Sequence, residues 1–425
     1  MTPRRITETK PGDWTYVSEG GATIVFSYRG PYNVQFSGHV LRLRKVVHRS
    51  SDASNNKLLN TNTEQPDDSM IAFQENIISK LVPSEFLPSL DVVLLDEEWL
   101  RSFVELHDGD RPAERRQTDQ IDVHRKKGVL ATDLIGGTQI AMEIKPKWGF
   151  LPLECHLSPE TVALKRVTCR FCMHTCFRVK QGDVCTTYCP LDLFSRDESR
   201  VRKALRALWA GWYESGGSLN NLRFFVSGRM AKPDDDDSMK ILAHFFSEDE
   251  STDTENLQES FASSLMQALV DSPVLLLLST LQRTLDILDV EGLSKLYTQS
   301  SPDLPGDGLG SSIPDPSMEE WEDFVRVYTS DYHSWDHAAP SPGHLRHYLM
   351  AYLLSATFKD CSIIIRPRLQ IPSTTQVGPA RSFDTTIIDM DMKSMDRLGK
   401  WEKLDRRIAE HYKNSGNQRR CIDST

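Results

Sequence analysis

Hydrophobic and polar residues alternate along the first part of the chain, which predicts strands. The stretch WTYVSEGGATIVFSY, residues 14–28, divides into two alternating runs joined by Gly20 and Gly21, and HVLRLRKVV, residues 39–47, follows the same pattern. Alternation places apolar side chains on one face of a half-buried sheet. The remaining elements expected in this part are strands near 128–130 and over 139–144, and helices over 71–80 and 97–106.

Helical spacing replaces alternation after residue 195. Apolar residues recur there at intervals of three or four and fall on one helical face, which we interpret as part of the core. These residues are Val201, Leu205, Leu208, Trp209 and Trp212. Ser195 and Glu198 have the spacing of a capping box, so they predict the start of this helix.

The rest of the chain is expected to be mainly helical. Ser272 can cap a helix in which Pro273 takes the first position, because proline lacks the N–H that would be unsatisfied there. The expected helices are 257–270, 274–288, 343–356 and 394–412, and the expected strands are 361–365 and 385–392. Two stretches rich in polar and turn-forming residues, 50–69 and 300–317, are expected to be loops, and no internal repeat is found.

Composition limits the classes of protein that fit this pattern. A chain of 425 residues, 39% of them hydrophobic, can bury a large core and predicts two or three domains or one large two-lobed enzyme. The start, MTPRRITETK, lacks the apolar core of a signal peptide, and no apolar run is long enough to span a bilayer, so we expect no membrane partner. We expect a monomer in the cytoplasm and/or nucleus, with its eight cysteines as thiols.

The net charge of −10 argues against nucleic acid as a partner, because no long basic stripe offsets it. It does not exclude a small anionic ligand. A cleft can concentrate positive potential locally whatever the total charge of the protein.

The segment EIKPKWGFLP, residues 143–152, is neither a helix nor a plain strand in its pattern. Lys145 and Lys147 lie two apart, so they share one side of an extended segment, and Glu143 points the same way. Pro146 has no backbone donor and disfavours helix in the residue before it, which predicts the end of an edge strand that leaves its sheet. Two interpretations are open: charges on a solvated strand end, or two ammonium groups that clamp phosphates, with Glu143 paired to one of them or accepting from a hydroxyl.

The stretch TTIIDMDMKSMDRLGKW separates acids from bases. As a strand it puts Asp389, Asp391 and Lys393 on one face, and Lys393, Arg397 and Trp401 then follow at four-residue spacing on one helical side. Carboxylates at a strand end suit Mg²⁺, which takes one or two protein carboxylates and completes its shell with water and phosphates. The basic side suits the phosphates themselves. The alternative is a surface helix with scattered ion pairs.

Cysteines gather in one segment. A C-x2-C pair followed by a C-x3-C pair permits zinc, and the alternative is a set of buried thiols beside strands. The residues concerned are Cys169, Cys172, His174, Cys176, Cys185 and Cys189. Arg170 and Arg178 in the same stretch are equally compatible with an anion site.

Two weaker signals complete the candidate chemistry. SEGGAT, residues 18–23, is a glycine-rich turn between strands, where backbone donors can approach phosphates, although such a segment is often only a turn. Asp360, beside the apolar run CSIII, is a third acid at a strand end or simply a turn residue.

Four motifs occur together in an order that resembles the inositol-pentakisphosphate 2-kinase family. That family has an E-x-K-P-K-x-G-F-L-P box, a C-R-F-C-M-H segment, a C-P-L-D-L-F-S segment and a D-x-D-x-K box. The matching segments here are EIKPKWGFLP at 143–152, CRFCMHT at 169–175, CPLDLFS at 189–195 and DMDMK at 389–393. The resemblance runs from SEGGAT to the terminal helix.

This resemblance implies an α+β, two-lobed kinase-like fold with the ATP cleft between a β-rich N-terminal lobe, 1–155, and a larger mixed α/β C-terminal lobe, 156–425. It implies transfer of the γ-phosphate of ATP, with Mg²⁺, to the axial 2-hydroxyl of inositol 1,3,4,5,6-pentakisphosphate, which gives inositol hexakisphosphate. The alternatives are a kinase for another inositol phosphate, or a non-catalytic scaffold that binds inositol phosphate or zinc.

The resemblance also implies roles for individual residues. Those expected at ATP are Gly20, Gly21, Ala22, Thr23, Arg42, Asp133, Glu143 and Asp389. Those expected at the inositol phosphate are Arg115, Lys145, Lys147, His174, Arg178, Asn221, Lys393, Arg397 and Trp401. Asp360 and Lys145 are expected to be catalytic, with Asp360 taking the proton from the 2-hydroxyl, and Asp389 and Asp391 are expected to bind magnesium.

The chain departs from the family pattern at four positions. Ser18 and Thr23 replace the first glycine and the asparagine of the common G-E-G-x-A-N loop. Arg178 stands where lysine is common and Trp401 where tyrosine is common, so both keep their type but change donor geometry.

Zinc is expected to be absent or dispensable. Some relatives hold a structural zinc with a histidine before the first box and a cysteine pair with a histidine in the C-terminal lobe. Leu134 takes the first of these positions, and no C-x2-C pair occurs over 300–360.

Overall fold

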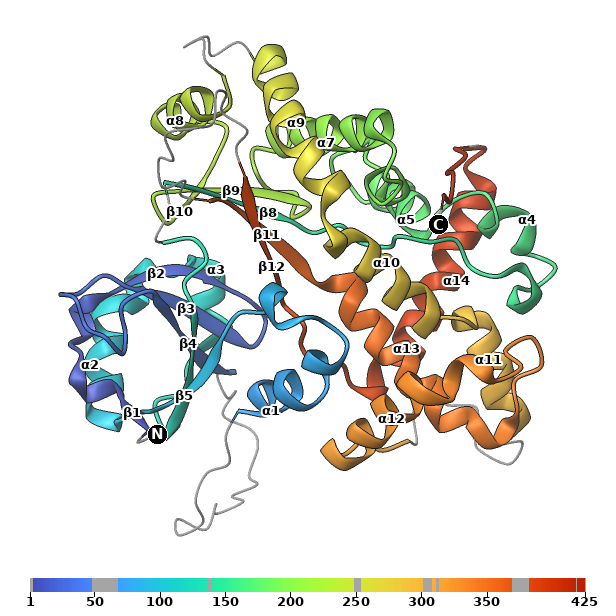
Figure 1. The fold of residues 1–425 in the computed structure, drawn as a ribbon, viewed down its shortest axis with the longest axis horizontal. Helices are drawn as coiled ribbons and strands as arrows, with labels where there is room; N and C mark the ends of the chain where they lie inside the picture. Colours follow the sequence, from blue (N-terminus) through green and yellow to red (C-terminus); the bar gives the residue numbers. More distant parts are fainter. Residues whose placement is uncertain are drawn as a thin grey trace, which may run out of the picture. The chain divides into compact units, whose positions relative to one another are not determined.

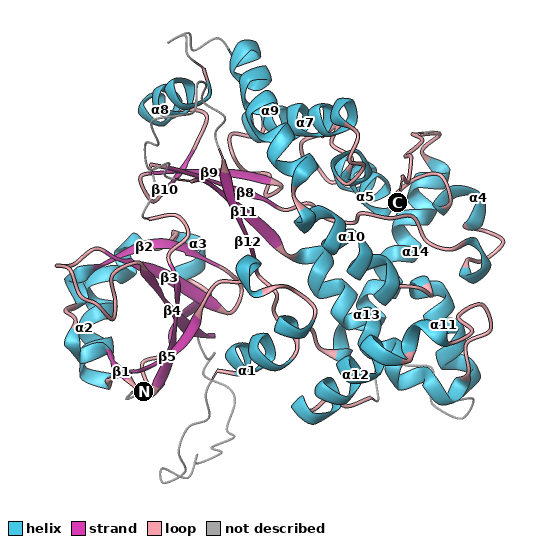
Figure 2. Ribbon diagram, viewed as in Figure 1, coloured by secondary structure: helices cyan, strands magenta, loops and turns pink. Residues whose placement is uncertain are grey.

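The computed structural model describes residues 3–47, 68–136, 139–247, 254–300, 308–310, 313–368, 382–417 and 419–424. The chain divides into two compact units. Unit 1 comprises Met1–Glu75, Pro88–Gln139 and Ser227–Met230, and unit 2 comprises Asn76–Leu87, Ile140–Val226 and Ala231–Thr425. Helices and sheets are both present, as the α+β prediction requires (Figure 2).

Unit 1 is built on a seven-stranded sheet with the order β1-β5-β7-β4-β3-β2, and β6 pairs with the end of β4. Among the described residues of this sheet, β1 and β5 pair in parallel, and the pairs β2–β3, β3–β4, β4–β6, β4–β7 and β5–β7 are antiparallel. The strands are β1 Arg4–Arg5, β2 Trp14–Glu19, β3 Thr23–Tyr28, β4 His39–Val47, β5 Leu90–Leu94, β6 Asp119–Ile121 and β7 Lys127–Thr132. The predicted hairpin over 14–28 and the strand over 39–47 are therefore confirmed.

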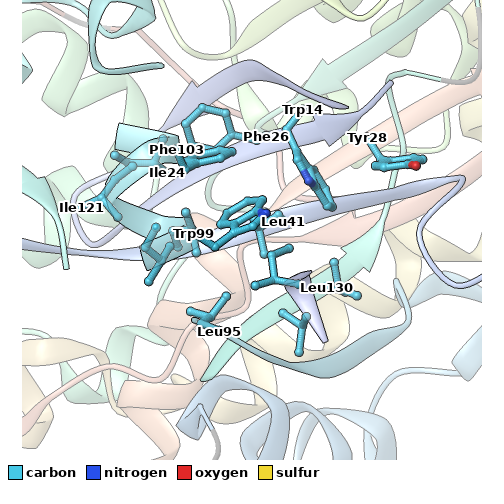
Figure 3. Packing of buried hydrophobic residues seen from close by; sticks show 14 of the residues in the cluster. Trp14, Ile24, Phe26, Tyr28, Leu41, Leu95, Trp99, Phe103, Ile121 and Leu130 are labelled. Atoms are coloured by element: carbon cyan, nitrogen blue, oxygen red, sulfur yellow. The ribbon is translucent and has the colours of Figure 1, made fainter. Parts of the chain in front are cut away.

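Helix α2, Glu97–His107, packs its apolar stripe against this sheet (Figure 3). Asp96 caps it by accepting from the Trp99 N–H at 2.9 Å. The ring centroids of Phe103 and Phe26 lie 4.6 Å apart in an edge-on contact, and Trp99 stacks on Phe103 at 4.8 Å. Such aromatic pairs stabilise a core by more than their buried area alone would, so these contacts hold the β2–β3 hairpin against α2. Two short helices, α1 Ser69–Asn76 and α3 Ala113–Arg116, lie between the strands in the sequence.

The sheet of unit 2 has the order β10-β9-β8-β11-β12. Its strands are β8 Ile140–Ile144, β9 Leu222–Val226, β10 Arg229–Ala231, β11 Ser362–Pro367 and β12 Phe383–Ile388. β8 pairs antiparallel with β9 on one side and with β11 on the other. The prediction that 143–152 leaves an edge strand is therefore wrong. Pro146 lies beyond the strand end, where its missing N–H costs no ladder bond.

Helices make up most of unit 2 (Figure 1). They are α4 Val162–Lys165, α5 Arg170–Val179, α6 Pro190–Leu193, α7 Glu198–Glu214, α8 Asp236–Phe246, α9 Thr254–Asp271, α10 Pro273–Leu285, α11 Asp289–Ser300, α12 Met318–Ser330, α13 Leu345–Asp360 and α14 Leu398–Asn414. α7 packs beside α9, α10 beside α13, and α5 beside α14. In the described residues no single helix is long and apolar enough to cross a membrane. Two helical stretches, Glu255–Asp271 and Pro273–Ser300, together have the length and composition of a membrane span, but the chain bends by 64° between them.

The predicted helices near 257, 274, 343 and 394 are confirmed as α9, α10, α13 and α14, with shifted ends. Ser272 caps α10 by accepting from the Val274 N–H, with Pro273 in the first turn. The apolar face predicted on α7 is buried.

Three local predictions are wrong or incomplete. Asp197, not Ser195, caps α7, and it accepts from the Arg200 N–H at 2.9 Å while the Ser195 hydroxyl donates to the Asp192 carbonyl. The helix expected over 71–80 is α1 followed by a separate 3-10 turn. Of the two predicted loops, residues 50–67 and half of 300–317, namely 301–307 and 311–312, lie outside the described residues.

Candidate active site

Three consecutive carbonyls of the 143–152 box each accept a hydrogen bond from a side chain that is distant in the sequence. Residues 145–147 follow the end of β8, so no sheet partner satisfies these carbonyls. The bonds are Asn221 Nδ2 to Lys145 O at 3.1 Å, Tyr188 Oη to Pro146 O at 2.8 Å, and Gln282 Nε2 to Lys147 O at 3.0 Å. The segment is therefore fixed without being part of a helix or strand.

Gln282 of α10 links this segment to the end of α13. It is fully buried, donates to the carbonyls of Lys147 and Phe358 at 3.0 and 2.9 Å, and accepts from the Gly149 N–H at 2.8 Å. Lys147 between these anchors has φ 67°, a left-handed conformation that non-glycine residues rarely adopt. No motif marks Gln282, because a buried glutamine in an apolar helix has no characteristic pattern.

Asp360, the last residue of α13, meets three lysines. Its Oδ1 lies 3.3 Å from Lys145 Nζ and 3.4 Å from Lys147 Nζ, and its Oδ2 lies 3.5 Å from Lys393 Nζ. The Asp360 side chain is 52% exposed, whereas the three lysine side chains are 13–21% exposed. The carboxylate thus faces outward over a layer of ammonium groups that carry an excess of positive charge.

The same lysines set the protonation of Asp360. Partial burial pushes the pKa of its carboxyl upward, but Lys145, Lys147 and Lys393 outweigh this and hold the pKa below its ordinary value. The group is therefore ionised at neutral pH and can accept a proton from a hydroxyl.

Helix α5 adds further cations beside Lys147. Burial, followed by the charges of Arg170, Arg178 and Lys147, lowers the pKa of His174 to about 4. Burial also lowers the pKa of Lys147, and the negative charge of Asp360 offsets part of this decrease. Arg178 forms an ion pair with Asp183. The structure thus brings the predicted residues His174 and Arg178 into the electrostatic range of Lys147.

The residue before Asp360 anchors the end of α13 in the core. The Lys359 ammonium lies 4.2 Å from the centroid of the Trp148 ring and 4.9 Å from that of Tyr352, and it pairs with buried Asp286. Cation–π contacts of this kind strengthen when the cation is desolvated. Lys359 therefore fixes the position of the neighbouring Asp360.

The acids after β12 depart from the predicted pattern. β12 ends at Ile388, and Asp389 has φ 63°, so the prediction that Asp389, Asp391 and Lys393 share one strand face is wrong. Lys393 nevertheless reaches Asp360. Asp389 is half-buried and directly follows Ile388, which pairs with Ser362, while Asp391 is exposed.

The predicted basic helical side is only partly formed. α14 begins at Leu398, so Lys393 precedes it and Arg397 is its exposed N-terminal neighbour. Trp401 in the first turn is half-buried, with its ring 6.1 Å from that of Tyr352.

Glu143 lies buried on β8 between its two neighbouring strands. Its Oε1 accepts from the Ser362 hydroxyl at 2.8 Å, and its Oε2 lies 3.4 Å from an Arg223 nitrogen. The hydroxyl that Glu143 accepts from in this structure is that of Ser362, and acceptance from a ligand hydroxyl stays a prediction. The cation is an arginine on the adjacent strand, not Lys145 or Lys147.

In unit 1 the glycine turn between β2 and β3 faces open space. The Gly20 N–H donates to the Thr23 carbonyl at 2.9 Å, and the Ala22 carbonyl accepts from the Lys45 N–H at 3.0 Å. A Cβ built on Gly20 or Gly21 would meet nothing within 4 Å, and neither glycine has a positive φ. The fold of the protein itself therefore does not require glycine at either position.

The other predicted residues of unit 1 have different surroundings. Arg42 on β4 has a buried Nε with no partner within the described ranges. Asp133 is buried, and its carboxylate accepts from the N–H groups of Ile135 and Gly136 and from the Ser27 hydroxyl. Arg115 lies exposed on α3.

A buried network of charges supports the glycine turn, and no motif in the sequence indicates it. Glu19, the last residue of β2, contacts Lys45 at 3.0 Å and Arg111 at 2.9 Å, and both cations also contact Asp119. The side chains of Glu19 and Lys45 are each 2% exposed, and that of Arg111 is fully buried. The network joins β2, β4 and β6 at the base of the turn.

Comparison with known proteins gives one consistent result. The family model for inositol-pentakisphosphate 2-kinase matches residues 16–407. The chain is 33% identical to an inositol-pentakisphosphate 2-kinase of Cryptococcus neoformans, covering 97% of this chain and 96% of that protein. Proteins of the same name are 27% identical in Oryza sativa, with 95% and 94% covered, and 26% identical in Danio rerio, with 94% and 93% covered.

Proposed function

Because this chain belongs to the inositol-pentakisphosphate 2-kinase family, we propose that it transfers the γ-phosphate of ATP to the 2-hydroxyl of inositol 1,3,4,5,6-pentakisphosphate. The products are ADP and inositol hexakisphosphate. The observation that carries the proposal is the exposed carboxylate of Asp360 over three ammonium groups. Phosphoryl transfer needs a carboxylate aligned on the attacking hydroxyl and fixed positive charge around the phosphates.

The reaction assigns a distinct task to each group around Asp360. The oxygen of the 2-hydroxyl attacks the γ-phosphorus, the bond from that phosphorus to the ADP oxygen breaks, and the hydroxyl proton passes to Asp360. Lys145 lies nearest the transferred phosphoryl group and balances its charge as bonds change. The remaining residues proposed for the inositol phosphates are Arg115, Lys147, His174, Arg178, Asn221, Lys393, Arg397 and Trp401.

The nucleotide is proposed to bind to the glycine turn. Open space around Gly20 and Gly21 supports this, because backbone N–H groups without side chains can approach phosphates. The other proposed contacts are Ala22, Thr23, Arg42, Asp133, Glu143 and Asp389. A two-lobed kinase arrangement with lobes over 1–155 and 156–425 and ATP between them remains a prediction from the family.

Magnesium is proposed to bind at Asp389 and Asp391. Two carboxylates after a strand end supply the oxygen ligands that Mg²⁺ prefers, and leave positions for water and phosphate. When bound, the ion would neutralise charge on the phosphates of ATP. Three further expectations stay predictions: a monomeric protein, no nucleic-acid or membrane partner, and a cytoplasmic and/or nuclear location.

The test is a kinase assay with the full-length protein, ATP, Mg²⁺ and purified inositol phosphates, with products separated by anion-exchange chromatography. We expect inositol hexakisphosphate and ADP in equal amounts. A higher kcat/KM for another inositol phosphate would favour the alternative kinase activity. Tight binding of inositol pentakisphosphate without any product would favour a non-catalytic scaffold.

A further inference from the structure

Four cysteine thiols from distant parts of unit 2 converge on one point. Their sulfur atoms all lie within 4.8 Å of one another, and all four residues are buried. Two come from the start of α5, one from the residue before α6 and one from the C-terminal segment. They are Cys169, Cys172, Cys189 and Cys421.

The spacing of these sulfurs fits a metal centre and not a disulfide. The Sγ atoms of Cys169 and Cys189 lie 3.9 Å apart, and all the cysteines of the chain are free. Tetrahedral zinc with Zn–S bonds of about 2.3 Å separates its sulfur ligands by about 3.8 Å, whereas a disulfide needs about 2.05 Å. The observed arrangement is thus close to that of four thiolates around one ion.

The local backbone also suits a metal ligand pair. Cys169 is the N-cap of α5, and the Cys172 N–H points at its sulfur at 3.5 Å. A helix N-terminus and a backbone donor both favour the thiolate, which is the form that binds metal. We propose that these four cysteines bind a single zinc ion in a closed structural site.

This proposal replaces the expectation that zinc is absent or dispensable. The C-x2-C spacing found one ligand pair, but it grouped Cys169 with His174 and Cys176, which are not part of the cluster. The fourth ligand, Cys421, is remote in sequence, so spacing could not find it. A second group that could hold a metal by distance is Asp289, Glu291 and Asp405, but the Lys165 ammonium contacts all three carboxylates and takes the place of a cation.

A zinc ion here would tie the C-terminal segment to the active-site box. The Cys421 N–H donates to the Val167 carbonyl at 2.8 Å. Two residues later, the Asp423 carboxylate accepts from the Leu151 N–H at 2.7 Å and pairs with Arg283. The zinc site would therefore fix the C-terminal segment next to the segment that carries Lys145 and Lys147.

The test is the zinc content of the full-length protein, purified without chelator and measured by inductively coupled plasma mass spectrometry. We expect stoichiometric zinc in the wild type and in the matched control Cys185→Ser, whose cysteine is exposed and outside the cluster. Cys421→Ser should lose most of the zinc, and Cys421→His should keep it, because histidine replaces cysteine in many zinc sites.

A cobalt experiment keeps the proposal testable if Cys421→Ser does not fold. Wild-type protein refolded with Co²⁺ should show the thiolate-to-metal charge-transfer and visible bands of a tetrahedral four-sulfur site. Three outcomes would overturn the proposal: folded wild type without zinc or cobalt bands, zinc content unchanged in folded Cys421→Ser, or a disulfide between two of the four cysteines in the native protein. None of these readouts depends on kinase activity.

Discussion

Gln282 holds Lys147 in a left-handed backbone conformation by donating its side-chain amide to the Lys147 carbonyl at 3.0 Å. The same side chain binds Gly149 and Phe358. A single buried amide on α10 therefore sets the position of Lys147 relative to the end of α13, where Asp360 lies.

Replacing Gln282 with leucine should lower the stability of the fold and weaken phosphate binding by Lys147. The change leaves buried backbone groups without partners, at a cost of about 1–3 kcal/mol for each such group. We expect a lower free energy of unfolding and a higher KM for the inositol phosphate. Denaturant unfolding and steady-state kinetics measure the two effects. The exposed Gln267→Leu is the matched control, and unchanged stability in Gln282→Leu would contradict the assigned role.

Asp360→Asn should remove turnover but not binding. The substitution deletes the proton acceptor and also a negative charge beside a polyanion, so the inositol phosphate should bind as tightly or more tightly. Loss of a general base slows a reaction by roughly 10²–10⁴-fold. Rate and affinity are measured separately by single-turnover kinetics and calorimetry, with Asp384→Asn, a partly exposed residue paired with Arg368, as control. A residual rate above about a hundredth of the wild type would exclude Asp360 as the base.

The cations of the site should separate into two classes. Lys147 and Arg397 are expected to bind phosphates alike in ground and transition states, so Lys147→Met and Arg397→Met should raise KM with a smaller effect on kcat. Lys145→Met should lower kcat itself, because charge redistributes on the transferred group.

Steady-state kinetics at two ionic strengths checks this separation, and the exposed Lys403→Met serves as control. The losses should deepen with salt, since the cations that remain act in a partly screened site. If all three variants kept both constants, the clamp would be wrong and the lysines would be ordinary solvated charges.

Binding of inositol pentakisphosphate should be coupled to proton uptake at His174. The pKa of this residue is lowered to about 4 by burial and by neighbouring cations, so its ring is neutral in the free protein near neutral pH. A polyanion offsets those cations and raises the pKa toward about 6.5. The complex then takes up a proton between about pH 6.5 and pH 4, and affinity gains up to about tenfold per pH unit as pH falls through this window.

Calorimetry in buffers of different ionisation enthalpy measures that proton. The phosphates of the ligand titrate in every experiment, so the informative quantity is the difference between wild type and His174→Gln. Equal proton uptake in the two proteins would show that His174 does not face the ligand.

Gly20→Ala and Gly21→Ala should affect the nucleotide and not the fold. Because a Cβ at either position meets nothing, the folded protein should keep its stability or gain about 0.4–1 kcal/mol from reduced freedom of the unfolded chain. The KM for ATP should rise, since the methyl group occupies the space proposed for phosphate. Thermal unfolding and ATP kinetics test this, with Gly109→Ala, also in open space, as control. An unchanged KM would mean that the segment is only a turn.

The sequence could predict those parts of the molecule that depend on local periodicity. The hairpin over 14–28, the α7 face and the cap at Ser272 all rest on contacts between near neighbours in the chain. The order and register of the strands in the sheet of unit 2 do not rest on such local contacts. The position of β8 in the middle of the sheet depends on pairing with β9 and β11, which are remote in sequence, and Pro146 gave a misleading signal because it lies just beyond the strand.

Only those residues of the candidate site that are charged and belong to a motif could be predicted. Lys145, Lys147 and Lys393 were expected together, and the structure brings them to Asp360. The uncharged supports, Gln282 and Tyr188, have no pattern because their roles follow from burial next to an unpaired carbonyl. The strand predicted over 385–392 is present but ends early, at Ile388. Asp389 has a left-handed backbone conformation, and an alternating pattern of side chains cannot reveal such a change.

The anchoring of the 143–152 box extends to its amides. The Lys145 N–H donates to the Asn221 carbonyl, the Gly149 N–H to buried Gln282, and the Leu151 N–H to Asp423. Amides in a segment without helix or strand ordinarily exchange with solvent quickly, because they open locally at little cost. Here the Gly149 and Leu151 amides can exchange only when side chains from α10 and the C-terminal segment also move, and the Lys145 amide only when the backbone before β9 moves away. In hydrogen exchange, this irregular segment should therefore behave as part of the slowest core of unit 2.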